Sequence, residues 1–169
     1  MLQKNVFLKN LKDIERLLRG NQYSKALLIV NKLLEEYPFS TRLLLLKGRL
    51  IQLLDEESEL GELQDALDAL ELASELDDGS IDALNELAMF RHVVEDKQDE
   101  AILLFEKSIA KCLEFLEEAY LGKAKCLFET DRVFESLNCL NEGFQVIPHA
   151  AKLKAEKDYI LSIVQGVEK

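Results

Sequence analysis

The sequence predicts an all-α fold built from antiparallel pairs of helices, and three observations support this. Leu, Glu, Ala, Lys and Asp dominate the 169 residues, whereas Pro and Gly occur only two and seven times; this composition favours helices over strands. Apolar residues recur at three- and four-residue steps along almost the whole chain, which is the spacing of one helix face. Short segments separate these stretches, and short connections place successive helices antiparallel.

The first half of the chain contains four expected helices with recognisable ends. A turn at Gly20-Asn21-Gln22 separates the first two helices, and Pro38 ends the second. Ser40 or Thr41 can cap the third helix, and Gly79 ends the fourth. The four helices are expected over residues 4–19, 23–36, 41–54 and 62–77.

The second half continues in the same order and ends with an unpaired helix. Ser80 is the expected N-cap of the next helix, and Pro148 closes the last pair. Helices are expected over residues 81–94, 98–113, 116–130, 133–146 and 150–165.

The second helix of each pair carries the same pattern, which indicates an internal repeat. A small residue lies one turn into these helices, at Ala26, Ala66, Ala101 and Ser136. A larger apolar residue follows four positions later, at Val30, Leu70, Phe105 and Leu140. The small residues are 40, 35 and 35 positions apart, and such a period is typical of helical repeat arrays.

These residues resemble the tetratricopeptide-repeat family over essentially the whole chain. The family's small first-helix residue corresponds to Gly48, Ala88 and Ala124, its large anchor to Leu44, Leu84 and Tyr120, and its closing proline to Pro38 and Pro148. The pattern is degenerate: Ile14 replaces a small residue, Asp78 replaces a proline, and the third repeat has no closing proline. The resemblance implies a right-handed α-α superhelix in one domain, residues 1–169, with repeats near 7–40, 41–80, 81–116 and 117–150. The helix at 150–165 is then the cap that covers the last repeat.

The resemblance also implies a concave groove lined by the first helices, which in this family usually receives an extended peptide or a helix. An Arg side chain in such a groove can bind a carboxylate through two hydrogen bonds. The residues expected in the groove are Arg19, Arg42, Leu45, Arg49, Gln52, Asn85, Met89, His92, Leu121, Lys125 and Phe128. The alternative is that these are ordinary surface residues.

Charge divides the chain into three parts. Residues 1–49 sum to +6, residues 50–90 to −13 and residues 91–169 to −4, which gives the total of −11. The acidic part forms a patch with three interpretations: a solvated outer face, a docking site for a basic partner, or a calcium loop. The calcium loop is disfavoured because Leu60 and Ala66 occupy the positions of the required Gly and Glu. The patch consists of Asp55, Glu56, Glu57, Glu59, Glu62, Asp65, Asp68, Glu71 and Glu75.

Several functional classes find no support in the sequence. The two His and three Cys form no catalytic or metal-binding spacing, so we expect no enzyme, no cofactor and no metal. Strong acidity disfavours nucleic acid as a ligand. No apolar stretch could span a bilayer, so we expect no membrane partner, and three cysteines without close pairing favour a cytoplasmic protein.

Three functional hypotheses follow. The first is an adaptor, scaffold or co-chaperone whose groove holds a peptide or helix of another protein. The second is an immunity- or antitoxin-like inhibitor that binds a basic protein through the acidic patch. The third is an enzyme or a regulatory subunit of one. A homodimer is also compatible with the sequence, because Val6, Phe7 and Leu8 lie on the uncovered first helix.

Overall fold

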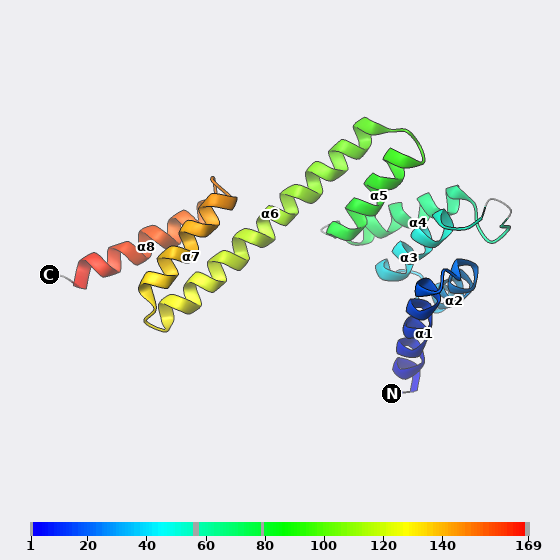
Figure 1. Cartoon of the computed structure of the whole chain (residues 1–169), viewed down its shortest axis with the longest axis horizontal. Coiled ribbons are helices and arrows are strands. Elements are labelled where there is room, and N and C mark those ends of the chain that lie inside the picture. Colours follow the sequence, from blue (N-terminus) through cyan, green and yellow to red (C-terminus); the bar gives the residue numbers. More distant parts are fainter. Residues whose placement is uncertain (1, 56–57, 79, 168–169) are drawn as a thin grey trace. The chain divides into compact units, whose positions relative to one another are not determined.

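The computed structural model of the chain is all-α (Figure 1). It describes residues 2–55, 58–78 and 80–167, and within these ranges no residue lies in a strand. The described residues form eight helices: α1 (Leu2–Arg19), α2 (Tyr23–Glu36), α3 (Thr41–Gln52), α4 (Leu63–Leu76), α5 (Ile81–Val93), α6 (Gln98–Glu129), α7 (Val133–Val146) and α8 (Ala151–Val167). Outside α6, each expected helix ends within two residues of the observed one.

The turns between paired helices use residues suited to a left-handed backbone. Asn21, Asp96 and Asp131 have φ values of 54°, 56° and 59°, respectively. Asn and Asp tolerate this conformation better than other non-glycine residues, because their short polar side chains bond locally. Ser80 caps α5 as expected, since its hydroxyl oxygen accepts a hydrogen bond from the backbone N–H of Ala83 at 3.3 Å.

The expectation of separate helices at 98–113 and 116–130 is wrong, because α6 runs through both ranges without a break. The physical reason lies in the residues at the expected turn, Leu113-Glu114-Phe115-Leu116. None of them is Gly, Pro, Asn, Asp or Ser, and the third repeat lacks the closing proline that ends a helix. The backbone therefore continues its helical hydrogen bonding through this segment.

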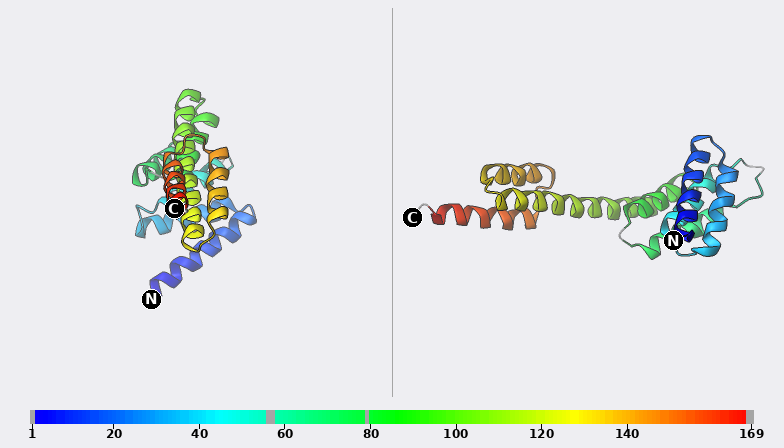
Figure 2. Two further views of the ribbon diagram at one scale, coloured as in Figure 1. Left: turned by 90° about the vertical axis from the view of Figure 1, so that its left-hand side faces the viewer. Right: turned by 90° about the horizontal axis from the view of Figure 1, so that it is seen from below.

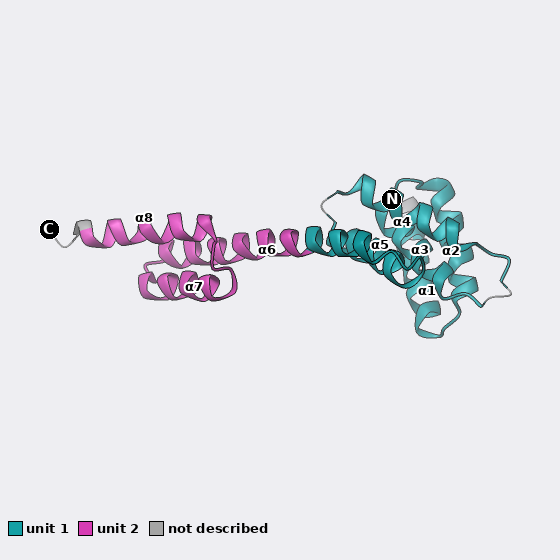
Figure 3. Cartoon of the chain, turned by 90° about the horizontal axis from the view of Figure 1, so that it is seen from above, with its two compact units in different colours: residues 1–108 teal, residues 109–169 magenta. Residues whose placement is uncertain are grey.

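The chain divides into two compact units, residues 1–108 and 109–169, with α6 contributing to both (Figure 3). The expected repeat boundary near residue 116 thus falls inside a helix. The assignment of all 169 residues to one domain stays a prediction.

In unit 1, successive helices pack side by side, with α3 between α2 and α4 (Figure 1, Figure 2). The main core contains fully buried aliphatic side chains from α2, α3 and α4, including Val30, Leu43, Leu50 and Leu70. Gly48 allows α3 and α4 to approach closely, because a Cβ atom there would lie 2.7 Å from Cγ of Leu70. The small residue expected at this position therefore has the predicted packing role.

Unit 2 has a separate core between the later part of α6, α7 and α8. It is formed by Ala124, Cys139, Leu140, Ala150, Leu153 and Ile160. Ser136 is fully buried there, and its hydroxyl donates a hydrogen bond to the carbonyl oxygen of Ala124 at 2.7 Å. Because Leu153 and Ile160 belong to α8, this helix covers apolar residues of the preceding two helices.

Candidate partner-binding groove

The structure brings three of the expected groove residues together in unit 1. Arg42, Leu45 and Arg49 project from α3 at spacings of three and four residues and line one cavity of about 450 Å³. Its other lining residues come from α3, the α4–α5 connection and the start of α5: Thr41, Leu46, Asp77, Ser80 and Asp82. The cavity is a groove between first helices of adjacent repeats, and we call it the α3–α5 groove.

The charges in the α3–α5 groove are largely paired. Arg49 forms an ion pair with Glu86 of α5 at 2.6 Å. The hydrogen bond to Glu86, together with the negative charges of Glu86 and Asp82, raises the pKa of Arg49 although burial opposes this. Arg42 makes only a longer contact of 3.4 Å with Glu15, and its side chain is 63% exposed. Arg42 is therefore the more available cation for an incoming carboxylate.

The five other expected groove residues of unit 1 do not line this cavity. The Gln52 side chain donates a hydrogen bond to the Gly48 carbonyl oxygen at 3.0 Å and lines a different cavity. The His92 ring is exposed, with Nδ1 lying 2.7 Å from the Gln98 side-chain oxygen. Met89 is exposed and Asn85 half-buried on α5, while Arg19 is exposed at the end of α1.

Sequence reasoning also missed residues that the structure places in the groove. Asp77 and Ser80 lie in the connection before α5, and Asp82 lies in its first turn. The prediction considered only residues on the faces of the first helices. It therefore missed these residues, which reach the groove from a helix terminus. The signal that could have found them is the N-cap at Ser80, which places the acidic first turn of α5 beside the start of α3.

Two of the three expected groove residues of unit 2 line a second, smaller cavity of about 280 Å³. Lys125 and Phe128 line it together with Glu129 of α6 and two residues of α8, Glu156 and Tyr159. Lys125 lies 3.7 Å from Glu156, and the rings of Phe128 and Tyr159 meet edge to face with centroids 6.3 Å apart. Leu121 is half-buried and packs against the core of unit 2. The capping helix thus occupies part of the surface expected to receive a partner.

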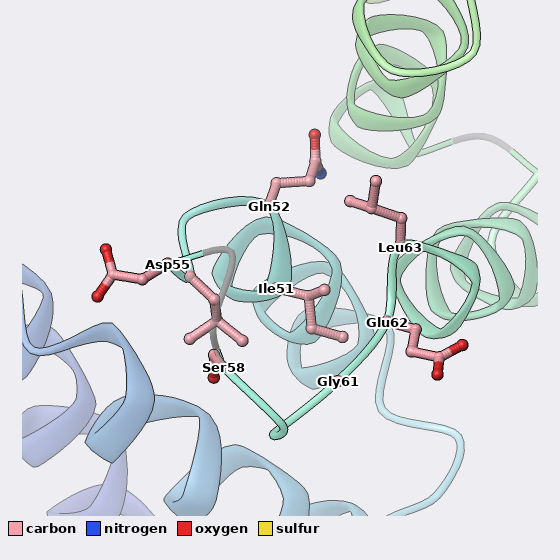
Figure 4. Close-up of a pocket in the computed structure, with 8 residues that line it drawn as sticks. Ile51, Gln52, Asp55, Ser58, Gly61, Glu62 and Leu63 are labelled. Atoms are coloured by element: carbon pink, nitrogen blue, oxygen red, sulfur yellow. The ribbon is translucent and has the colours of Figure 1, made fainter.

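A third cavity, of about 530 Å³, lies where α3 ends and α4 begins (Figure 4). Ile51 and Leu63 are among its apolar lining residues, and Asp55 and Glu62 of the acidic patch also line it. Gly61 approaches α3 closely, since an added Cβ would lie 3.1 Å from the Ile51 side chain. The acidic patch therefore borders an apolar hollow.

The described members of the acidic patch differ in their surroundings, and Glu56 and Glu57 lie outside the described residues. Asp65 accepts a hydrogen bond from the backbone N–H of Glu62 at 2.9 Å and so helps to cap α4. Asp68 accepts a hydrogen bond from Gln64, and Glu71 forms an ion pair with Arg91 of α5. Asp55, Glu59 and Glu75 are exposed. Part of the acidic charge therefore stabilises the fold itself.

The remaining reactive groups offer little for catalysis. Cys139 is buried, and burial raises the pKa of its thiol, which disfavours the nucleophilic thiolate. Cys112 and Cys126 are exposed on α6. Within the described ranges, no group of His, Cys, Asp and Glu is arranged to hold a metal ion. Among the described helices, none combines the length and apolar character needed to cross a bilayer.

Comparison with known proteins identifies the fold. No protein-family model and no curated protein matches the sequence. A solved structure titled as the crystal structure of MamA protein superposes with a TM-score of 0.51 and 16% sequence identity, covering 94% of this chain and 87% of that one. MamA is a tetratricopeptide-repeat-like helical protein. The chain is thus an all-α protein with a tetratricopeptide-repeat-like fold of the α-α superhelix class.

Proposed function

We propose that this chain is a non-catalytic adaptor, scaffold or co-chaperone that binds a peptide or helix of another protein in the α3–α5 groove. The observation that carries the proposal is the convergence of Arg42, Leu45 and Arg49 on one cavity. The fold that the chain shares with its structural neighbour also suggests a protein-interaction role.

The groove favours a ligand that combines an acidic and an apolar side chain. A carboxylate of the partner can accept hydrogen bonds from Arg42, whose contact with Glu15 is long and exposed. Leu45 and Leu46 supply apolar surface beside it. Asp77 and Asp82 also line the cavity and repel a second carboxylate, so the charge pattern restricts the number of acidic groups that a ligand can place there.

Selection from a library of random displayed peptides tests the proposal. Peptides enriched on the wild-type chain should carry a carboxylate next to an apolar residue. Arg42→Ala should weaken their binding about ten-fold or more, because a charge-assisted hydrogen bond contributes about 1.5–3 kcal/mol. Lys32→Ala, which removes the same charge from the exposed face of α2, is the matched control and should leave the affinity unchanged.

The same selection separates the groove from the acidic patch. If the enriched peptides are basic and lose affinity with Asp68→Asn or Glu75→Gln rather than with Arg42→Ala, the inhibitor-like alternative is correct and the groove proposal fails. These two acidic residues are suitable because both are exposed and the hydrogen bond that Asp68 accepts comes from Gln64 of the same helix, whereas Asp65 caps α4 and Glu71 pairs with Arg91 of α5.

A further inference from the structure

Helix α6 leaves an apolar face uncovered that the equivalent helices of unit 1 bury. Alignment on Ala26, Ala66 and Ala101 makes Ile102 of α6 equivalent to Leu27 and Leu67. Those two leucines are 0% and 9% exposed, whereas Ile102 is 52% exposed. Ile109, which is 59% exposed, is in the same way equivalent to Leu34 and Ser74, both half-buried, and Leu34 packs against the cores around α2 and α3.

The later half of α6 also exposes residues whose equivalents in the first helices of unit 1 are buried. Relative to the anchor residues Leu44, Leu84 and Tyr120, its residue Ala119 is equivalent to Leu43 and Ala83, and Cys126 to Leu50 and Phe90. All four equivalents in α3 and α5 are buried, whereas Ala119 and Cys126 are exposed. In a regular repeat array the two halves of α6 would be two separate helices, and the exposed residues of each would pack against the other. Because α6 is one continuous helix, its two halves cannot make this contact.

The uncovered residues form a heptad seam, a pattern typical of helices that pair. Positions a of the heptad are Ile102, Ile109, Leu116 and Lys123, and positions d are Phe105, Cys112, Ala119 and Cys126. All but Lys123 are apolar or small. Phe105 and Leu116 are half-buried and the other six are exposed. A seam of this kind buries its apolar residues only against a second helix.

We propose that α6 pairs with α6 of a second copy of this chain, antiparallel and centred on Glu114. The seam is symmetric about this residue: Ile102 and Cys126 lie twelve positions to either side of it, Ile109 and Ala119 five, and Cys112 and Leu116 two. An antiparallel pair therefore places each of these residues opposite its counterpart in the other copy. Large side chains then face small ones, which permits close packing.

The twofold symmetry of this pair buries the exposed seam residues of both halves of α6 in both copies. The earlier half of one helix covers the later half of the other, and the reverse contact is identical, so the assembly closes as a dimer. Phe105 and Lys123 lie nine positions either side of Glu114 and would face each other. Lys123 is then the single charge in the seam, and such a residue fixes register at the expense of stability. The pairing does not depend on the α3–α5 groove.

Sedimentation equilibrium of the full chain tests the proposal. The wild-type chain should be a dimer, and Ile109→Glu should raise the dimer dissociation constant roughly a hundred-fold, because both copies lose a buried apolar side chain. Leu103→Glu is the matched control: Leu103 has the same 59% exposure on α6 but lies outside the seam, so the dimer should persist. A monomeric wild-type chain, a dimer that survives Ile109→Glu, or equal loss in both variants would overturn the proposal.

A second variant tests the seam without any risk of mistaking misfolding for dissociation. Lys123→Leu replaces the only charged seam residue and should lower the dimer dissociation constant roughly ten-fold. The Lys123 side chain makes only an exposed contact with Glu142 at 3.9 Å, so its replacement removes little from the fold. A dissociation constant that stays the same or rises would show that Lys123 lies outside the interface.

Distance measurements between spin labels distinguish the antiparallel register from a parallel one. Labels on Glu114→Cys and, separately, Lys125→Cys suit this purpose, with Cys112 and Cys126 replaced by Ala and the buried Cys139 retained. In the antiparallel dimer the labels at 114 lie level, whereas those at 125 lie about 33 Å apart along the axis, from a rise of about 1.5 Å per residue. Equal distances at the two positions would overturn the antiparallel pairing.

Discussion

Arg49 of α3 and Glu86 of α5 form an ion pair with a 2.6 Å separation, which links the first helices of two adjacent repeats. The pair holds the guanidinium of Arg49 beside Leu45 in the α3–α5 groove. It also removes much of the attraction that Arg49 would exert on a partner's carboxylate. The positive charge that the groove offers to a partner therefore resides chiefly on Arg42.

Release of Arg49 should strengthen the binding of acidic peptides. We expect Glu86→Gln to raise the affinity of the selected peptides by about two- to five-fold, equivalent to about 0.5–1 kcal/mol for a partly exposed pair. Isothermal titration calorimetry measures the change. Glu135→Gln is the matched control, because it releases Arg132 from an ion pair outside the groove. Equal effects of the two variants would mean that the peptides respond to net charge and not to Arg49.

Gly122 and Gly143 of unit 2 should respond to alanine in opposite directions. A Cβ at Gly143 would lie 2.5 Å from Leu153, a fully buried residue, and 3.1 Å from the ring of Tyr120. Overpacking of this kind costs about 1–3 kcal/mol. A Cβ at Gly122 meets nothing within 4 Å, so Gly122→Ala should stabilise the helix by up to about 1 kcal/mol. Urea denaturation followed by circular dichroism measures both, and a stabilising Gly143→Ala would contradict the packing described here.

Neutralisation of two carboxylates of α4 should change the free energy of unfolding in opposite directions. Glu71 pairs with Arg91, which is nearly buried, so Glu71→Gln should lower the free energy of unfolding by up to about 1 kcal/mol. Glu75 is exposed and lies four residues from Glu71 on α4. Its neutralisation should raise stability by a few tenths of a kcal/mol, because like charges at this spacing on a helix repel. Denaturation at low ionic strength is the measurement, and a common sign for both variants would refute this difference.

The stability of unit 1 should depend on pH through Glu95. Burial tends to raise the pKa of Glu95, but hydrogen bonds from Lys97 and Arg91 outweigh it and hold this pKa below its ordinary value. A carboxyl group of this kind stabilises the fold above its ordinary pKa of about 4.3 and loses that contribution as the pH falls through the lowered value. The free energy of unfolding should therefore fall more steeply below about pH 5 in the wild-type chain than in Glu95→Gln.

Neutralisation of an exposed carboxylate away from this network is the control for the pH series. Glu36→Gln, at the exposed end of α2, should leave the steepness of the acid limb as in the wild-type chain. If Glu95→Gln and Glu36→Gln give identical curves, the ion pairs of Arg91 and Lys97 do not contribute to acid sensitivity.

Much of the fold could be predicted because helix formation is local. The apolar spacing of α2 and the residues at its ends, Tyr23 and Pro38, define that helix without reference to any neighbour, and its predicted bounds match the observed ones. The close approach at Gly48 could likewise be predicted, because a small residue in the repeat pattern implies contact between paired helices. The candidate groove could be predicted in part, because Arg42, Leu45 and Arg49 share a helix face.

Residue pattern alone determined the all-α class, the helix pairs and the buried faces, because these depend on spacing within each segment. Only the tertiary structure decided that Glu86 neutralises Arg49 and that Tyr159 of α8 reaches Phe128. Each of these depends on which side chains from distant segments meet. Such contacts depend on the balance of interactions in the whole fold, and the spacing of residues along the sequence does not reveal that balance.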